Sequence, residues 1–321
     1  MGNQLTVKGI YGSGMVLQRN NVNCIFGTAI KNSTVSVIFR NNLESNIVDN
    51  NGNWKILFNS GDKGGPFQLS VKTDTDEILY DDVYVGEVWV NSGQSNAQLP
   101  MSRMKFSYPD EFQLAKNENI RMITIPIKYS FDGEKDSVEN PTWICASPQT
   151  LGEMSGTGYF FAKKLAKELD LPIGIINASQ GGSPIESWMN EDSLKKIKDE
   201  KYFERLEFCK NPKNITNDIE ISQKKAKEWN DSLQENDIGL KEDWLNVDMN
   251  KVNDSWTDFQ IPGKFKLNGE SGIVWFKREI ELTKSQVEKF NNTQTFLWLG
   301  TIIDSDEVWV NGIKCGETPY T

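Results

Sequence analysis

A short polar stretch that follows an apolar run carries the residue types best suited to chemistry. Residues 91–96 read Asn-Ser-Gly-Gln-Ser-Asn and follow the run Val83 to Val90, whose valines and tryptophan are typical of a β-strand. Asparagine, serine and glycine end such a strand and allow a tight turn. Between a strand and an expected helix, Ser95 would expose its hydroxyl beside backbone N–H groups that face the bond it attacks. This pattern suits a nucleophile in acyl transfer; the alternative is an ordinary loop.

Two adjacent glycines, Gly181 and Gly182, follow a second apolar run, Ile173 to Asn177. Glycine lets the backbone approach a substrate closely and turn its N–H groups toward an oxyanion. The alternative interpretation is a simple turn.

The elements before the glycines predict where these residues meet. Ser155 is a candidate N-cap for a helix that runs to about Leu169. Its apolar face would consist of Phe161, Leu165 and Leu169, with Ala162 and Ala166 beside them. A helix followed by a buried strand is the crossover unit of a parallel sheet. Active sites in such sheets lie at the carboxyl ends of the strands, so we expect Ser95 and the glycine pair at one rim.

Composition narrows the functional classes. The chain has 321 residues and a net charge of −10, which argues against nucleic acid or an anionic membrane surface as the main partner. No apolar run reaches the roughly 18 residues of a membrane span, and residues 1–6 lack a signal-peptide core. The localisation stays open between the cytoplasm and secretion with a removed signal. The sequence contains no histidine, which is the usual general base of a serine hydrolase.

Four ordered motifs share their pattern with one known family. They are Met15 to Arg19 (MVLQR), Gly86 to Asn96 (GEVWVNSGQSN), Ile175 to Trp188 (IINASQGGSPIESW), and the pair Gly272 to Arg278 and Asp304 to Gly312. Together they resemble the sialate O-acetylesterase family of the SGNH hydrolases, from end to end of this sequence.

The resemblance implies an α/β fold with an SGNH-type (flavodoxin-like) parallel sheet. Residues 1–84, which read as short strands separated by turns, would form an N-terminal β-sandwich, with Trp54 in its core. Residues 85–240 would be the first part of the hydrolase domain, with charged helices over 191–236. Residues 241–321 would be an incomplete inserted β-domain of the jelly-roll, galactose-binding-like type.

Within residues 241–321 the apolar runs predict three strands. These are Ile273–Phe276, Phe296–Leu299 and Val308–Val310, and Asn311-Gly312 is a hairpin-turn signal. We interpret the tryptophans of this region mainly as core residues, namely Trp256, Trp275, Trp298 and Trp309.

The resemblance also assigns roles to residues. It implies that Ser95 attacks the acetyl carbonyl of an O-acetylated sugar, while the N–H groups of Ser95 and of Gly182 or Gly181 bind the oxyanion. Of the two glycines we favour Gly182. We expect the flanking Gln94, Asn96 and Ser183 to contact the substrate. No metal or organic cofactor is implied.

The sequence departs from the family pattern in three ways. The third motif of the family and its terminal Asp-x-x-His motif are absent, so the residues here lack the base. We expect a C-terminal segment or a second chain to supply Asp and His, and we expect these 321 residues alone to hydrolyse esters feebly or not at all. Ala97 stands where the family usually has Met, and Gln180 stands where a Trp is common.

Other functions remain open beside the sialate esterase. One is an acetylesterase that acts on a different acetylated glycan. Another is a non-catalytic carbohydrate-binding protein on a degenerate esterase scaffold, which the lack of histidine motivates.

Overall fold

The structure is a computed structural model that describes residues 4–131, 133–197, 200–246, 256–261, 263, 272–300, 302 and 305–319. The chain divides into two compact units, Met1–Lys210 and Asn211–Thr321, which are described separately.

A large mixed sheet organises the first unit. Its strand order is β10-β9-β11-β8-β7-β4-β5, and β2 also pairs with β8. Strands β2, β9 and β11 belong to parallel pairings, whereas β7, β5 and β10 pair antiparallel with their neighbours. The bounds are β2 (Val16–Gln18), β4 (Thr34–Phe39), β5 (Asn42–Ile47), β7 (Gly64–Lys72), β8 (Glu77–Gly93), β9 (Asn117–Thr124), β10 (Trp143–Ala146) and β11 (Ile173–Ser179).

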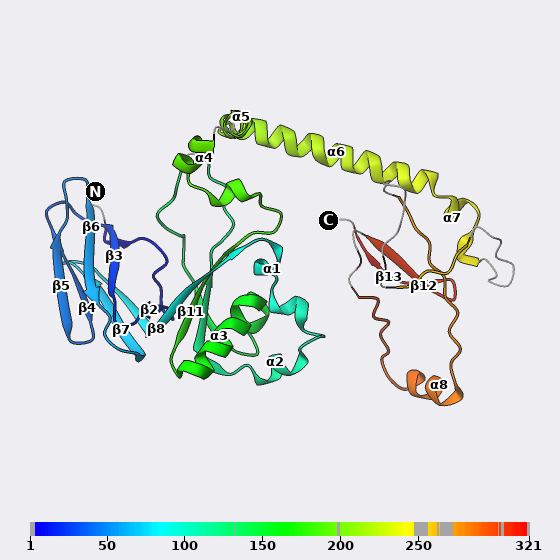
Figure 1. The fold of residues 1–321 in the computed structure, drawn as a ribbon, viewed down its shortest axis with the longest axis horizontal. Helices are drawn as coiled ribbons and strands as arrows, with labels where there is room; N and C mark the ends of the chain where they lie inside the picture. Colours follow the sequence, from blue (N-terminus) through cyan, green and yellow to red (C-terminus); the bar gives the residue numbers. More distant parts are fainter. Residues whose placement is uncertain are drawn as a thin grey trace. The chain divides into compact units, whose positions relative to one another are not determined.

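Strand β8 belongs to both halves of this sheet. Its first part pairs antiparallel with β7, and its last part, Glu87 to Gly93, pairs in parallel with β11. Figure 1 shows this strand passing from the N-terminal layer into the helical part of the unit. The predicted domain limit between residues 84 and 85 therefore falls inside one continuous strand.

A three-stranded antiparallel sheet covers the N-terminal half. It consists of β1 (Thr6–Val7), β3 (Val22–Thr28) and β6 (Asn53–Asn59). Alternate residues of β6 point inward, and Trp54 is buried among them, as predicted. Side chains of both sheets, such as Ile25 and Leu69, form one apolar core.

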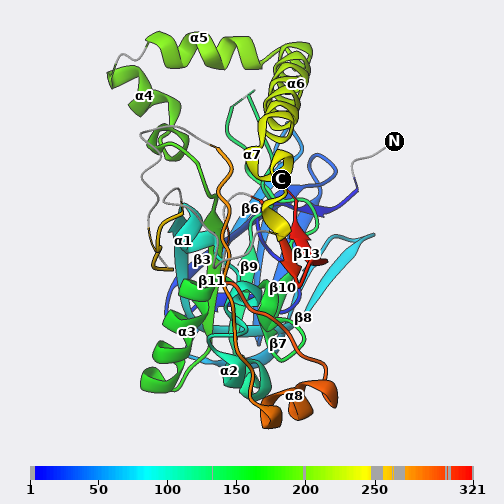
Figure 2. The same ribbon diagram turned by 90° about the vertical axis from the view of Figure 1, so that its right-hand side faces the viewer.

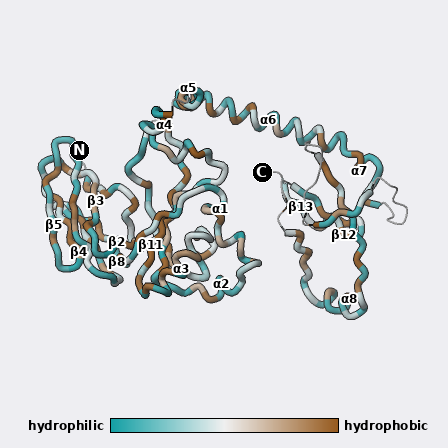
Figure 3. The backbone as a smooth tube through the Cα atoms, in the orientation of Figure 1, coloured by the Kyte–Doolittle hydropathy of each residue, from teal (hydrophilic) through white to brown (hydrophobic). Residues whose placement is uncertain are grey.

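Helix α3 (Gly156–Leu169) confirms the predicted helix with its Ser155 cap. The Ser155 hydroxyl accepts a hydrogen bond from the Gly158 N–H at 3.2 Å. The chain then passes to β11, and Figures 1 and 2 both show α3 lying along this strand. A second core lies between them, and Figure 3 colours much of β11 brown, the hydrophobic end of its scale.

The predicted apolar face of α3 is confirmed at Ala162 and Ala166 but wrong at Phe161 and Leu169. Phe161 is 43% exposed and Leu169 is also exposed, whereas Tyr159, Ala162 and Ala166 are buried. Small side chains let the helix lie close to the sheet, so the alanines face inward. Phe161 instead packs edge-on against Trp89, with ring centroids 5.3 Å apart.

Short helices and turns connect these strands in the first unit. They are α1 (Ser95–Gln98), η1 (Met101–Met104), α2 (Pro109–Leu114), η2 (Leu151–Glu153), η3 (Ile185–Trp188), α4 (Glu191–Ile197) and α5 (Glu200–Cys209). Strand β10 has no clear signal in the sequence and forms because it pairs with β9.

The second unit begins with α6 (Pro212–Asn236), and the predicted charged helices over 191–236 are confirmed by α4, α5 and α6. Lys227 and Asp231 form an ion pair at 2.6 Å on the solvated surface of α6. The unit also contains α7 (Ile238–Lys241), η4 (Trp244–Asn246), α8 (Lys284–Asn291), β12 (Asp306–Val310) and β13 (Ile313–Thr318).

The hairpin in the second unit is confirmed, but two predicted strands are wrong. Asn311 and Gly312 both have positive φ, as a tight β12–β13 turn requires. Residues 273–276 and 296–299 are not strands, because they find no pairing partner among the residues that the structure describes.

The tryptophans of the second unit fall into two groups. Trp275 and Trp309 stack with ring centroids 5.9 Å apart, and both are half-buried, so they pack together without reaching a buried core. Trp298 is 70% exposed, so the core interpretation is wrong for this residue. Among the described residues, no helix is both long and apolar enough to cross a membrane.

Candidate active site

Ser95 lies where the largest sheet reaches its carboxyl rim. Strand β8 ends at Gly93, and Ser95 is the first residue of the single-turn helix α1. Gly93 has a φ of +147°, in a region that favours glycine, and a Cβ there would lie 3.3 Å from that of Ala97. Ser95 is exposed, and its hydroxyl makes no hydrogen bond to the residues described. Because α1 has four residues, its individual N–H groups matter more here than a helix dipole.

The structure brings the predicted nucleophile and the glycine pair together. The parallel register pairs Ser179 of β11 with Gly93 of β8, and the next N–H, that of Gln180, donates to the Gly93 carbonyl at 2.9 Å. A Cβ built on Gly181 would lie 3.5 Å from both Cα and Cβ of Ser95. A side chain at residue 181 would therefore crowd the serine.

The two glycines differ in what their N–H groups do. The Gly181 N–H donates to Oε1 of Gln98 at 2.7 Å. The Gly182 N–H donates to no acceptor among the described residues, and its Cα faces open space at a φ of +74°. Gly182 thus has a donor without a described acceptor, whereas the donor of Gly181, the glycine that packs against Ser95, is occupied.

The remaining candidates divide between the surface and the loop interior. Gln94 is exposed, and its amide donates to the Ser183 carbonyl, while Asn96 is exposed without a described hydrogen bond. Ser183 is only 7% exposed; its hydroxyl donates to the Gln180 carbonyl at 2.7 Å and accepts from Trp188 Nε1 at 3.0 Å. Ser183 is therefore already engaged in holding its own loop.

A buried polar network beneath α1 was not predicted from the sequence. The Asn91 amide nitrogen donates to Asn177 Oδ1 at 2.8 Å, to Ser155 Oγ at 3.0 Å and to the Ala97 carbonyl at 3.1 Å. The Ser155 hydroxyl donates to the same carbonyl at 2.6 Å. Buried polar groups need such partners, and these bonds fix the turn that carries Ser95. The signal in the sequence is an asparagine near the end of both apolar runs.

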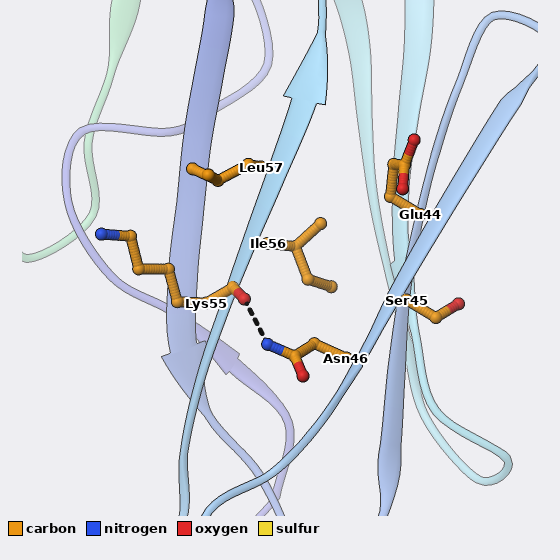
Figure 4. A pocket seen from close by; sticks show the side chains of 6 residues that line it. All are labelled: Glu44, Ser45, Asn46, Lys55, Ile56 and Leu57. Atoms are coloured by element: carbon orange, nitrogen blue, oxygen red, sulfur yellow. Dashed lines mark hydrogen bonds between the residues drawn. The ribbon is translucent and has the colours of Figure 1, made fainter.

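A separate hollow lies between strands β5 and β6 and is drawn in Figure 4. It has a volume of about 300 Å³, and the Asn46 amide crosses it to donate to the Lys55 carbonyl at 2.9 Å. None of the predicted site residues lines it, so it does not bear on the candidate site.

No protein-family model matches the chain. Human sialate O-acetylesterase is 28% identical over 198 residues, which cover 56% of this chain and 38% of the human protein. The enzyme of the same name from Mus musculus is 26% identical over 198 residues and is covered to 37%.

A solved structure agrees with these relatives. The crystal structure of a carbohydrate acetylesterase from Xanthomonas citri matches with a TM-score of 0.57 and 33% identity, over 59% of this chain and 43% of that protein. The mixed α/β sheet therefore corresponds to an esterase-like fold. The chain spans less than half the length of each of these proteins. Over the part that it shares with them, the chain is similar to the sialate O-acetylesterases and to this carbohydrate acetylesterase.

Proposed function

We propose that this chain carries the nucleophile and part of the oxyanion hole of a carbohydrate O-acetylesterase. The observation that carries the proposal is the shared rim. There Gly181 packs against Ser95, whose hydroxyl has no partner among the described residues, and the next residue, Gly182, keeps an N–H without a described acceptor. The relatives, named as sialate O-acetylesterases and a carbohydrate acetylesterase, support the reaction class. Within this reaction class, we propose that the O-acetyl group is carried by sialic acid. Because sialic acid is an anion and the chain has a net charge of −10, another acetylated glycan is the alternative.

The reaction would proceed in two steps. Ser95 Oγ attacks the acetyl carbonyl carbon, and the N–H groups of Ser95 and Gly182 stabilise the negative oxygen of the tetrahedral intermediate. The sugar oxygen leaves with a proton, and water then releases acetate from the acetylated serine. Gln94 and Asn96, at the same turn, are proposed to contact the sugar, with Ser183 supporting the loop.

These 321 residues contain no histidine, the usual general base for a serine nucleophile. We propose that a C-terminal segment or second chain supplies a histidine oriented by an aspartate. The proposal uses no metal or organic cofactor.

We also propose how the chain divides into the domains that would accompany this function. Strands β8, β9 and β11 with α3 would belong to the SGNH-type domain of residues 85–240. Residues 1–84 would be the preceding β-sandwich, and residues 241–321 the inserted jelly-roll domain.

The test is acetate release from a panel of O-acetylated sugars. The complete protein from its native source, with its intact mass measured, is compared with its Ser95→Ala variant and with the 321-residue chain. We expect rapid release by the complete protein, a loss of at least about a thousandfold in Ser95→Ala, and little release by the 321-residue chain. Equal release by the wild type and by Ser95→Ala would contradict the proposal.

The lack of histidine favours one second candidate, a non-catalytic carbohydrate-binding protein. That function predicts glycan binding that is unaffected by Ser95→Ala and no acetate release by the complete protein. A glycan array probed with both variants separates the two functions.

A further inference from the structure

A third loop reaches the rim that carries Ser95. Strand β9 runs parallel to β11, and the Ile125 N–H donates to the Asn177 carbonyl at 2.9 Å, one residue beyond the end of β9. The chain therefore leaves β9 at the same carboxyl edge from which the Ser95 turn and the glycine loop emerge. Tyr129 lies on this third loop.

Tyr129 is tethered to the glycine loop by its polar end. Nε2 of Gln180 donates to the Tyr129 hydroxyl at 3.3 Å. The backbone of Gln180 is itself fixed, because its N–H donates to Gly93 at 2.9 Å and its carbonyl accepts from the Ser183 hydroxyl at 2.7 Å. A short series of hydrogen bonds thus links Tyr129, through Gln180, to Gly93 just before the Ser95 turn and to Ser183 of the glycine loop.

The tyrosine ring has no large packing role that would explain its place. Tyr129 is 74% exposed. The residues before and after Tyr129 hold the conformation of the loop. Lys128 forms an ion pair with Glu139 at 2.6 Å, and the Ser130 hydroxyl donates to the Gly133 carbonyl at 3.2 Å. An aromatic ring that is anchored at its polar end and otherwise open to solvent offers an apolar face to a ligand.

We propose that Tyr129 and Gln180 form the wall that binds the sugar ring while the acetyl group lies at Ser95. This inference rests on the proposed function and names residues that determine its sugar specificity. The C–H face of a pyranose would lie on the tyrosine ring, and the Gln180 amide would offer hydrogen bonds to ring substituents.

The test measures, by NMR titration, the equilibrium binding of sugars to the 321-residue chain. The probes are the methyl α-glycoside of N-acetylneuraminic acid, the same glycoside with a 9-O-acetyl group, and acetylated xylobiose. We expect Tyr129→Ala to weaken binding of the preferred sugar about two- to tenfold, with or without its acetyl group, because the ring contact is lost. Tyr129→Phe keeps the ring but loses the hydroxyl that accepts from Gln180, so its affinity should lie between those of the wild type and Tyr129→Ala.

Two further variants separate this inference from the proposed function. Leu57→Ala removes an exposed apolar side chain on β6 and should leave binding unchanged. Ser95→Val crowds the acyl position and should weaken only the acetylated probes. If Ser95→Val binds the acetylated probes like the wild type while Tyr129→Ala binds them more weakly, the result contradicts the proposed esterase site but supports the proposed sugar-binding wall. The sugar wall is overturned if Tyr129→Ala binds every probe like the wild type, or if the wild type binds none of them.

Discussion

The two units use the same kind of apolar run in different ways. In the first unit, Ile173 to Ser179 became strand β11 because β8 and β9 pair with it on both sides. In the second, residues 296–299 are equally apolar, but they form no strand among the described residues, and Phe296 is 79% exposed. Whether an apolar segment forms a strand thus depends on the strands available to pair with it as much as on its own side chains.

The sharpest way to test this contrast is to shorten one buried and one exposed side chain. Ile175→Ala should lower the free energy of unfolding by about 2–5 kcal/mol, because it leaves a cavity in the core between β11 and α3. Phe296→Ala should change it by less than about 0.5 kcal/mol. Urea unfolding followed by circular dichroism measures both, and equal effects would refute the contrast.

The polar network under α1 gives the next effect. Asn91→Leu should cost about 1–3 kcal/mol of unfolding free energy, because acceptors on Asn177, Ser155 and Ala97 lose a buried donor. Asn96→Ala, at an exposed position of the same turn, is the matched control. Thermal unfolding of the two variants is the measurement, and a neutral Asn91→Leu would show that the network does not hold the turn.

Helix caps allow the same comparison between the units. Ser155→Ala should destabilise by about 0.5–2 kcal/mol, because the cap of α3 and the bond to the Ala97 carbonyl are lost together. Thr283 forms a capping box with Gln286 on α8, whose helix buries no residue. We expect Thr283→Ala to lower the helix signal locally while leaving the main unfolding transition in place. Hydrogen exchange of the two helices distinguishes these outcomes.

The smallest effect is a dependence of stability on pH. The hydrogen bond from Arg19 lowers the pKa of Glu87, since it favours the ionised carboxylate. A folded-state pKa below that of the unfolded chain gives stability that is present above the unfolded value, about 4.3, and is lost as the pH falls through the folded value. Glu87→Gln should therefore flatten the stability profile below about pH 4.3. Glu317→Gln is the control: Lys314 lowers the pKa of Glu317 too, but this exposed pair is screened and should leave the profile unchanged. An unaltered profile in Glu87→Gln would argue against the ion pair.

Much of the fold could be predicted from the sequence where the signals are local. The Ser155 cap, the helix before β11 and the Asn311-Gly312 turn each act within a few residues, and each was found. Strand β10 and the exposure of Phe161 and Leu169 on α3 could not be predicted, because both depend on which element packs against them. The strands expected at 273–276 and 296–299 failed for the same reason.

The candidate site shows a similar division. Ser95 and the glycine pair were predicted as neighbours from their places after parallel strands, and the structure brings them together. Asn91 and Tyr129 were missed, since their partners lie 86 and 51 residues away along the chain. The catalytic roles of Ser95, Gly181, Gly182, Gln94, Asn96 and Ser183 stay predictions until the variants are measured.

Strand β8 has a consequence for how the first unit could be dissected or rebuilt. The same 17 residues close the N-terminal layer and position the serine turn. A cut near residue 84 would leave each half with an unpaired edge and a broken strand. The N-terminal layer is therefore unsuited to exchange as an independent module. Its removal would disturb β8 and with it the position of Ser95.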